Sequence, residues 1–314
     1  MAGNECRDAA SGVGTSPVRI DTSVAHIARV QDYWLGGRDN FAADRHAGEE
    51  AAAAFPGLVA SVRSTRAFLA RTVRYLTADE GIRQFLDIGT GIPTAGNTHS
   101  VAQAIAPETL VVYMDNDPVV FAHARGLLSS GPHGSTAYLD ADLRDTGTVL
   151  AEAARMLDLT QPVALVLSSV LQFVPDAEDP LKIVDTLLDS LAPGSFLVVS
   201  HPANDIEARV MATMAARLNE LLAEQVTLRS QEEVERFFEG LRLVPPGVVR
   251  VPEWQPDSAE DAGRVAAMWG GVGQKCRPAR VPGWTPSPPG RPRPGPHAVH
   301  GAVDDWWMTG GQPR

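Results

Sequence analysis

From Gln84 onward, short apolar runs alternate with longer segments that have the periodicity of amphipathic helices. The apolar runs are QFLDIG, TLVVYMD, STAYLD, PVALVLSSV and SFLVVSH, and helical segments such as DPLKIVDTLLDSLAPG separate them. Unbroken apolar strands between helices are typical of a parallel sheet whose two faces are both covered. The pattern predicts a doubly wound α/β fold with right-handed crossovers.

Further elements are expected after this alternation. RLVPPGVVRVPEW and RVAAMWGGVGQ predict two more strands, and Ser230 with Glu233 has the spacing of a capping box at the start of a helix. An amphipathic helix is expected to follow SFLVVSHP, and we interpret its methionines as core filler. Its apolar face contains Ile206, Val210, Met214, Leu218 and Leu221.

Helical periodicity also precedes the sheet. Apolar side chains recur there at spacings of three and four, with Thr65 on the same stripe. Arg63, Arg66 and Arg74 lie off this stripe, and we expect them on a solvated face. The stripe contains Leu58, Val62, Leu69, Val73 and Leu76.

The two ends of the chain differ in composition from its middle. They are rich in small, polar, proline and glycine residues, and such segments bury too little apolar surface to offset the entropy of ordering. We expect four parts: a disordered leader over 1–16, an N-terminal helical cap over 17–80, a ligand-binding α/β domain over 81–274, and a disordered Pro/Gly/Arg-rich tail over 275–314.

Composition argues against several classes of protein. The 314 residues carry a formal net charge of −11, whereas proteins that bind nucleic acid normally present a basic surface. No apolar stretch reaches the ~20 residues that span a bilayer, and a secretory signal is not expected. Cys6 and Cys276 lie near the ends, so we expect neither a disulfide framework nor a metal site. A cytoplasmic protein without nucleic-acid or membrane partners is predicted.

The first apolar run breaks into a glycine loop, IGTGIPTAGNTH, of the kind that wraps a nucleotide-like ligand. A P-loop would end in GK[ST], but residues 85–99 contain no Lys or Arg. NAD prefers a third glycine where Thr94 stands, and Pro93 lacks a backbone N–H that could bind phosphate. S-adenosylmethionine has no phosphate and needs close backbone and hydrogen-bond acceptors, so the loop favours this cofactor.

The acceptors are aspartates at the ends of the apolar runs. Asp87, Asp115 and Asp142 are separated by 28 and 27 residues, about one βα unit each. Carboxyl ends of parallel strands meet at one edge of a sheet, so the three carboxylates should gather there. Ser168 and Ser169 bring the fourth strand to the same edge and add hydroxyls to the expected cofactor site. Asp115 alone would also suit the ribose of NAD, which stays an alternative.

FLDIGTG, VVYMDNDP and LDADLRD resemble the Rossmann-like S-adenosylmethionine-dependent methyltransferases. RVQDYWLGGRDNFAADRHAGE, GIPTAGNTH and WGGVGQK are similar, more narrowly, to an actinobacterial S-adenosyl methyltransferase family once labelled a domain of unknown function. The resemblance covers about Arg19 to Lys275. It implies a Rossmann-like methyltransferase sheet, mostly parallel with an antiparallel strand near the C-terminal end, and an N-terminal helical extension.

The resemblance also implies roles for single residues. Gly89 and Gly91 would pass beneath the methionine part of the cofactor, and Asp87 would help to hold its amino end. Asp115 would bind the ribose hydroxyls. Asn116 would lie beside the adenine, Asp142 would accept a hydrogen bond from its amino group, and Leu143 would lie alongside.

Candidates for chemistry are fewer. His201, just past the fifth strand in VVSHPAND, is the candidate general base, with a surface-loop histidine as the alternative. Gln172, in SSVLQFVPD, stands where methyltransferases often carry histidine, which weakens a catalytic role there. Tyr33, Asp39 and Asn40 are candidate acceptor-binding residues.

Tyr33, Asp39 and Asn40 belong to the segment YWLGGRDNF, which we predict to be a mobile flap that closes over the ligand. The alternative is a helix end with Gly36 and Gly37 as its C-cap.

The predicted function is methyl transfer from S-adenosylmethionine to an unidentified small molecule. Alternatives are a catalytically degenerate cofactor-binding or scaffolding protein and an NAD-dependent oxidoreductase. Methylation of DNA bases is not expected, because LSSVLQF lacks the NPPY-type loop that holds a flipped base.

Overall fold

The computed structural model describes residues 20–93, 96–121 and 135–276. The predicted leader, Thr94, and the tail beyond Cys276 therefore lie outside the described residues. In the described part, strands form one mixed sheet in the order β3-β2-β1-β4-β5-β8-β6, with β7 paired to β8. The strands are β1 (Gln84–Ile88), β2 (Leu110–Asp115), β3 (Thr136–Asp140), β4 (Ala164–Ser168), β5 (Phe196–Pro202), β6 (Leu241–Leu243), β7 (Val249–Arg250) and β8 (Met268–Lys275).

The first five strands run parallel, and β6, β7 and β8 supply the antiparallel end. The predicted doubly wound sheet with an antiparallel C-terminal strand is therefore confirmed. The segment RLVPPGVVRVPEW was expected to be one strand, but it forms β6 and β7 with a turn between them, followed by a 3₁₀ turn at Val251–Glu253. Pro245 and Pro246 explain the break, because proline cannot donate to a strand ladder.

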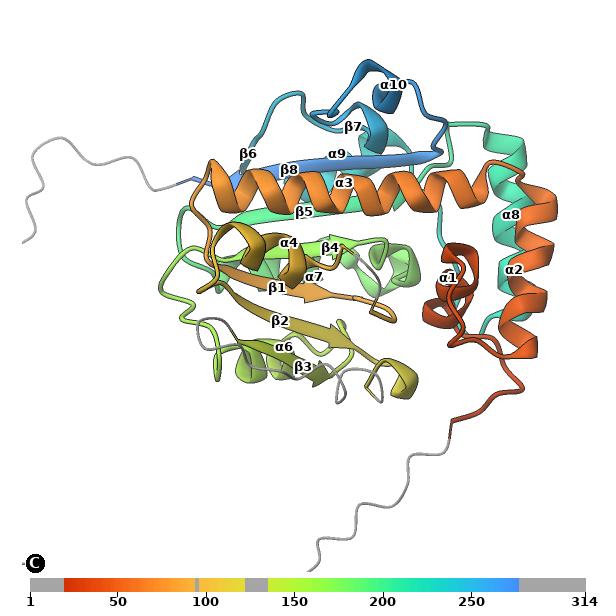
Figure 1. Ribbon diagram of the computed structural model, residues 1–314, viewed down its shortest axis with the longest axis horizontal. Helices are drawn as coiled ribbons and strands as arrows, with labels where there is room; N and C mark the ends of the chain where they lie inside the picture. Colours follow the sequence, from red (N-terminus) through yellow and green to blue (C-terminus); the bar gives the residue numbers. More distant parts are fainter. Residues whose placement is uncertain (1–19, 94–95, 122–134, 277–314) are drawn as a thin grey trace, which may run out of the picture. The chain divides into compact units, whose positions relative to one another are not determined.

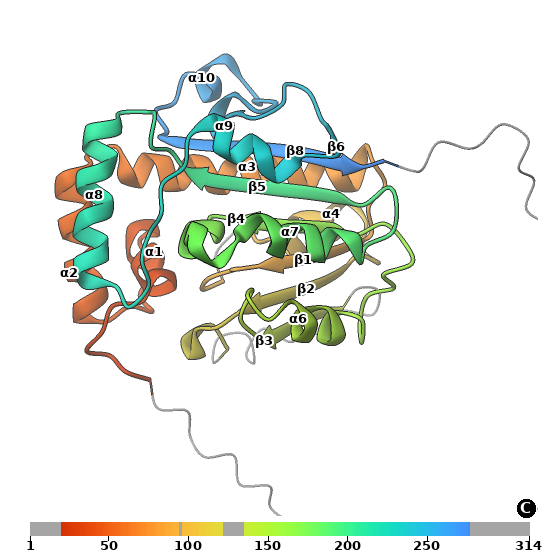
Figure 2. The same cartoon turned by 180° about the vertical axis from the view of Figure 1, so that it is seen from behind.

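Helices cover both faces of the sheet, as Figures 1 and 2 show from opposite sides. One face carries α3 (Leu58–Ala78) and α4 (Thr98–Ile105). The other carries α6 (Thr146–Ala153), α7 (Pro180–Asp189) and α9 (Gln231–Glu235). The predicted capping box at the start of α9 is present between Ser230 and Glu233.

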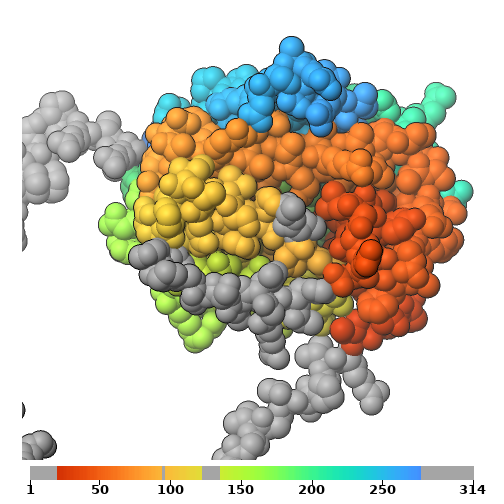
Figure 3. All heavy atoms as spheres, viewed as in Figure 1, coloured from red at the N-terminus to blue at the C-terminus, as the bar shows by residue number. Residues whose placement is uncertain are grey.

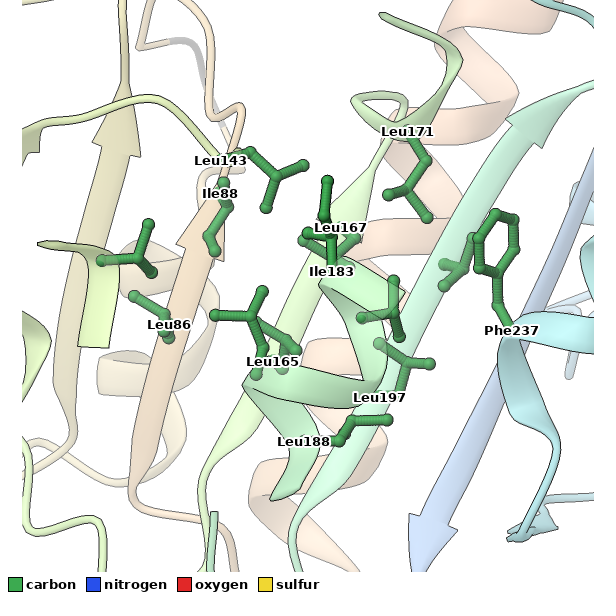
Figure 4. Packing of buried hydrophobic residues seen from close by; sticks show 14 of the residues in the cluster. Leu86, Ile88, Leu143, Leu165, Leu167, Leu171, Ile183, Leu188, Leu197 and Phe237 are labelled. Atoms are coloured by element: carbon green, nitrogen blue, oxygen red, sulfur yellow. The ribbon is translucent and has the colours of Figure 1, made fainter. Parts of the chain in front are cut away.

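The core beneath α7 shows why the apolar runs are unbroken. Side chains of the central strands interleave there with those of α7 and of the segment after β4 (Figure 4). Both faces of these strands are buried, so they contain no regular alternation of polar residues. The residues labelled in the figure are Leu86, Ile88, Leu143, Leu165, Leu167, Leu171, Ile183, Leu188, Leu197 and Phe237.

Helix α3 lies lengthwise on the opposite face, and its predicted apolar stripe is confirmed. Leu58, Thr65, Leu69, Val73 and Leu76 are buried. This helix therefore packs as part of the sheet layer, although we expected it within a separate N-terminal cap.

The helical cap lies at the carboxyl ends of the parallel strands. It consists of α1 (Ile27–Leu35), α2 (Ala42–Ala54) and α8 (Ala208–Leu221), which share one apolar cluster (Figures 1 and 2). In Figure 3, the red and orange atoms of α1, α2 and α3 form one continuous surface. None of the described helices is long and apolar enough to cross a membrane.

The remaining short elements connect these layers. Their bounds are Leu171–Phe173, Asp176–Glu178 and Arg236–Phe238 for three 3₁₀ turns, and Ala259–Ala262 for α10.

Candidate functional site

The aspartates predicted to gather at one edge of the sheet do so. Asp87 and Asp115 lie at the ends of the neighbouring strands β1 and β2, and they are only 4% and 8% exposed. Asp142 follows β3, the next strand along, and it lines the same cavity as Asp115. Buried carboxylates at the ends of adjacent parallel strands are the expected setting for a polar ligand at this edge of the sheet.

The glycine loop brings backbone close to this edge. Gly89 has φ +73°, and a Cβ there would lie 2.4 Å from the side chain of Val170. Gly91 has φ +66°, and its N–H donates to Oδ2 of Asp115 at 2.8 Å. Both positions thus require glycine for conformation, and Gly89 requires it for space as well.

Two adjoining cavities open at this edge. The acidic cavity contains Asp115, Asn116, Asp142, Leu143, Arg144 and Gly91 together with His26 and Glu224. The apolar cavity extends under the helical cap and contains Trp34, Phe55, Leu58, Met211, Met214, Leu218 and Val226, with Arg66, Asp87, Ser168 and Gln172 as its polar part. Both cavities share Ile27, Gln31, Gly89, Ser169 and Phe173.

In the acidic cavity, Asp115 retains capacity to accept hydrogen bonds. Its Oδ2 accepts from Gly91, and its Oδ1 accepts from the N–H of Asp117 at 3.0 Å. Burial raises the pKa of Asp115 above its ordinary value, although these two N–H groups act against burial. Each carboxylate oxygen has two lone pairs, so a ligand hydroxyl can still donate to either.

The other acidic-cavity residues form its rim. Asp142 accepts from the N–H of Arg144 at 2.8 Å, and Asn116 donates to Glu224 at 3.4 Å. Leu143 is buried and provides an apolar wall. This cavity therefore offers carboxylates and an amide around an apolar surface.

In the apolar cavity, Asp87 is fully enclosed. The hydroxyl of Thr98 donates to its Oδ2 at 2.6 Å. Burial raises the pKa of Asp87 to about 6, while Thr98 and the charge of Arg66 oppose the shift.

Arg66 corrects our expectation of a solvated face. Its Nη2 donates to Oδ1 of Asn97 at 2.8 Å, and its guanidinium lines the apolar cavity near Asp87. The helical period placed it off the stripe, but α3 is covered on a second side by the segment leading into α4. Arg63 and Arg74 are exposed as expected.

Ser168 and Ser169 lie at the end of β4, as predicted, and both hydroxyls lie near that of Ser200. The Oγ–Oγ distances are 2.9 Å and 3.3 Å. Ser169 has φ +57°, a strained value for a residue other than glycine. This bend turns the chain where the two cavities join.

Gln172 lies one turn beyond this bend and lines the apolar cavity. Its side chain is buried, and its Oε1 has no hydrogen-bond partner among the described residues. Such a group costs about 1–3 kcal/mol unless something binds it. The amide of Gln172 cannot act as a base, so its role here differs from the histidine role considered for this position.

His201 is not placed where a general base was expected. It lies within β5, fully buried, and contacts Arg229 through Nε2 at 2.8 Å and the carbonyl of Pro202 through Nδ1 at 3.0 Å. Burial and the charge of Arg229 lower the pKa of His201 to about 3. It lines neither cavity, because β5 continues through Pro202, so it is neither a surface-loop histidine nor a base at the site.

Tyr33, Asp39 and Asn40 also lie outside both cavities. Tyr33 donates through its hydroxyl to Glu49 at 3.1 Å. Asp39 and Asn40 both donate to Oδ2 of the buried Asp32, each at 2.8 Å.

The same segment is a helix end, as in the alternative. Gly36 has φ +84° and ends α1 as its C-cap. Gly37 packs so tightly that a Cβ would fall 1.9 Å from the Asp32 carboxylate. The face of α1 that meets the cavities is instead the one with Ile27, Gln31 and Trp34. The helical period of α1 is the sequence signal that indicates this face.

The profile of the S-adenosyl methyltransferase family matches residues 14–276. The chain belongs to this family. A solved DUF574 family protein from Streptomyces avermitilis MA-4680 is 44% identical, with a TM-score of 0.79, and the match covers 82% of this chain and 100% of that one. A protein from Thermobifida fusca YX, provisionally named a methyltransferase, is 39% identical, with a TM-score of 0.76 and coverage of 82% and 97%.

No curated protein matches the sequence. Both solved relatives come from actinobacteria, as the resemblance implied. The family assignment confirms the predicted cofactor, S-adenosylmethionine, and the predicted enzyme class, a methyltransferase.

Proposed function

We propose that this methyltransferase acts on a small molecule bound in the apolar cavity, with S-adenosylmethionine across the junction of the two cavities. The observation that carries the proposal is the sharing of Gly89, Ser169 and Gln31 by an acidic and an apolar cavity at the carboxyl edge of the sheet. A cavity enclosed by cap helices suits a small acceptor better than a polymer, and a net charge of −11 argues against nucleic acid. Action in the cytoplasm is part of the proposal.

The acidic cavity fits the adenosine half. Asp115 has free lone pairs for the ribose hydroxyls, and Asp142 has a carboxylate for the adenine amino group. Asn116 and Leu143 line the same space. This assigns to these residues the roles that the resemblance implied.

The polar part of the apolar cavity fits the amino-acid half. Asp87 and Arg66 carry opposite charges and line the same cavity beside Gly89. A zwitterion with an ammonium and a carboxylate is complementary to such a pair. We assign the ammonium of the cofactor to Asp87 and its carboxylate to Arg66. The sequence alone predicted a solvated face for Arg66.

The bound cofactor supplies an already activated methyl group. The task of the chain is then to hold the acceptor in line and to exclude water. The cap helices α1 and α8 enclose the apolar cavity, and Trp34, Met211 and Met214 keep its interior dry.

Calorimetry against S-adenosylmethionine, S-adenosylhomocysteine and NAD tests the cofactor assignment, with binding of the first two expected. Release of S-adenosylhomocysteine in the presence of small metabolites of the host then tests catalysis. Binding of NAD without binding of S-adenosylmethionine would refute the assignment. Cofactor binding without turnover across a broad set of acceptors would favour a scaffolding role.

A further inference from the structure

The apolar cavity contains a buried polar group that the cofactor assignment does not use. Gln172 is 6% exposed, and its Oε1 has no partner among the described residues. Asp87 and Ser168, its polar neighbours in the cavity, already have protein partners. A buried amide oxygen without a donor is costly, and a ligand N–H or O–H in the cavity would relieve this cost.

The backbone around Gln172 is firmly held. Its carbonyl accepts from the N–H of Thr227 at 2.8 Å. Arg229 donates to the carbonyls of Leu171 and Val174, at 3.0 Å and 2.9 Å, and His201 contacts the same guanidinium. The side chain is therefore presented from a fixed turn, which is what positioning a reacting group requires. His201 contributes here by contacting the guanidinium of Arg229, without lining the cavity itself.

Among the described residues that line the cavity, none is suited to deprotonating an acceptor. Of the described residues that line it, only Arg66 and Asp87 are titratable. Asp87 is bound by Thr98 and is assigned to the amino end of the cofactor. An amide such as Gln172 takes no proton at neutral pH. A hydroxyl acceptor usually needs a base, whereas an uncharged amine has a free lone pair.

The charge and polarity of the cavity restrict the class of acceptor molecules further. Trp34, Phe55 and Met211 are among the many apolar side chains that line it. A cation would lose its hydration in such surroundings. An aromatic amine is uncharged at neutral pH and matches the apolar wall.

We propose that the acceptor is an uncharged, largely apolar amine whose N–H donates to Oε1 of Gln172. This inference rests on the proposed function and deepens it. The nitrogen lone pair forms a bond to the methyl carbon as the carbon–sulfur bond breaks, and that electron pair stays on sulfur. Positive charge thus moves from sulfur to nitrogen, and the nitrogen loses its extra proton to water once the product leaves the cavity. The hydrogen bond to Gln172 strengthens as this charge develops, so it stabilises the transition state.

Matched ring compounds test the proposal. The protein loaded with S-adenosylhomocysteine is titrated with aniline, phenol, 6-aminoquinoline and 6-hydroxyquinoline, and binding is followed by calorimetry. We expect the amine of at least one pair to bind and, with S-adenosylmethionine, to be methylated on nitrogen, as mass spectrometry will show. Preferred binding and methylation of the hydroxy compounds, or failure of both amines to bind, would overturn the inference.

Variants of Gln172 test the hydrogen bond itself. Gln172→Met keeps the volume and removes the acceptor, and it should lower kcat for the amine roughly 10- to 100-fold and weaken amine binding about fivefold. Gln172→Glu keeps an acceptor and should retain amine binding. Gln161→Met makes the same change at an exposed site and should have no effect.

The two proposals fail in different ways. If S-adenosylhomocysteine does not bind the unaltered protein, the proposed function falls. If it binds, and Gln172→Met melts normally and methylates the amine at the unaltered rate, only the role of Gln172 falls. If Gln172→Met does not fold, loss of amine binding in a folded Gln172→Glu variant overturns it instead.

Discussion

Nδ1 of His26 lies 2.8 Å from Oδ2 of Asp117, which connects the N-cap of α1 to the segment that follows β2. Nε of Arg29 lies 3.3 Å from the same oxygen. Burial lowers the pKa of His26, but Asp117 outweighs burial and raises it above the ordinary value of 6.5. When it is protonated, His26 joins the helical cap to the wall of the acidic cavity by an ion pair with Asp117.

Replacing His26 with glutamine should make this connection visible as a function of pH. A histidine pKa that is raised by folding stabilises the protein fully below about pH 6.5, and the effect is lost as pH rises through the folded-state value. We expect His26→Gln to lower the free energy of unfolding by roughly 1–3 kcal/mol at pH 6, and less at pH 9. Denaturant unfolding measures both. His46→Gln, an exposed change on α2, is the control, and an equal loss at both pH values would contradict the ion pair.

Asp87→Asn should stabilise the protein at neutral pH while weakening cofactor binding. The raised pKa of about 6, against an ordinary value of 3.8, means that folding favours the protonated carboxyl. Stability is therefore lost as pH rises from about 4 to 6, by up to about 3 kcal/mol. Asparagine stays neutral and avoids this loss. Thermal melting from pH 4 to pH 8 should show the variant gaining on the unaltered protein, and parallel curves would be evidence against a buried carboxylate.

Asp115→Ala should weaken binding of S-adenosylhomocysteine roughly 10- to 200-fold. That range corresponds to the ~1.5–3 kcal/mol of hydrogen bonds to a charged group. Asp189→Ala removes an exposed aspartate on α7 and should leave the Kd unchanged. Calorimetry gives both values. Unchanged affinity in the Asp115 variant would contradict our placement of the adenosine half of the cofactor in the acidic cavity.

Alanine variants of two glycines with nearly equal φ allow the cost of backbone strain to be measured separately from the cost of steric crowding. Gly89 and Gly240 have φ of +73° and +78°, but only at Gly89 would a Cβ meet another side chain within 4 Å. Both alanine variants should lose roughly 1 kcal/mol to the left-handed backbone. Gly89→Ala should lose a further ~1–3 kcal/mol to overpacking against Val170, and with it cofactor affinity. Equal melting temperatures would show that the loop relaxes without cost.

Much of the site was predictable because parallel strands fix where their carboxyl ends lie. The spacing of Asp87, Asp115 and Asp142 gave their convergence without any knowledge of side-chain contacts. The position of His201 was not predictable in this way, since β5 extends farther than its apolar run suggested and encloses the ring.

The positions of Arg66 and of the segment after α1 were not predictable for a different reason. Helical periodicity identifies the face of α3 that meets the sheet, but not a second face covered by Asn97, which is 31 positions away from Arg66. The glycines after α1 indicate a turn equally well whether it is mobile or fixed. The hydrogen bonds that Asp32 accepts from Asp39 and Asn40 favour a fixed turn.

Helix α2 contacts α8, although about 150 residues of chain separate them. Contacts so distant along the chain form late, because a long loop must close before they stabilise anything. During synthesis, α1 and α2 leave the ribosome before α8, and their apolar sides are covered only when residues 208–221 have followed. We therefore expect the nascent chain to gain acceptor binding only after β5 and α8 have emerged, and to depend on chaperones until then.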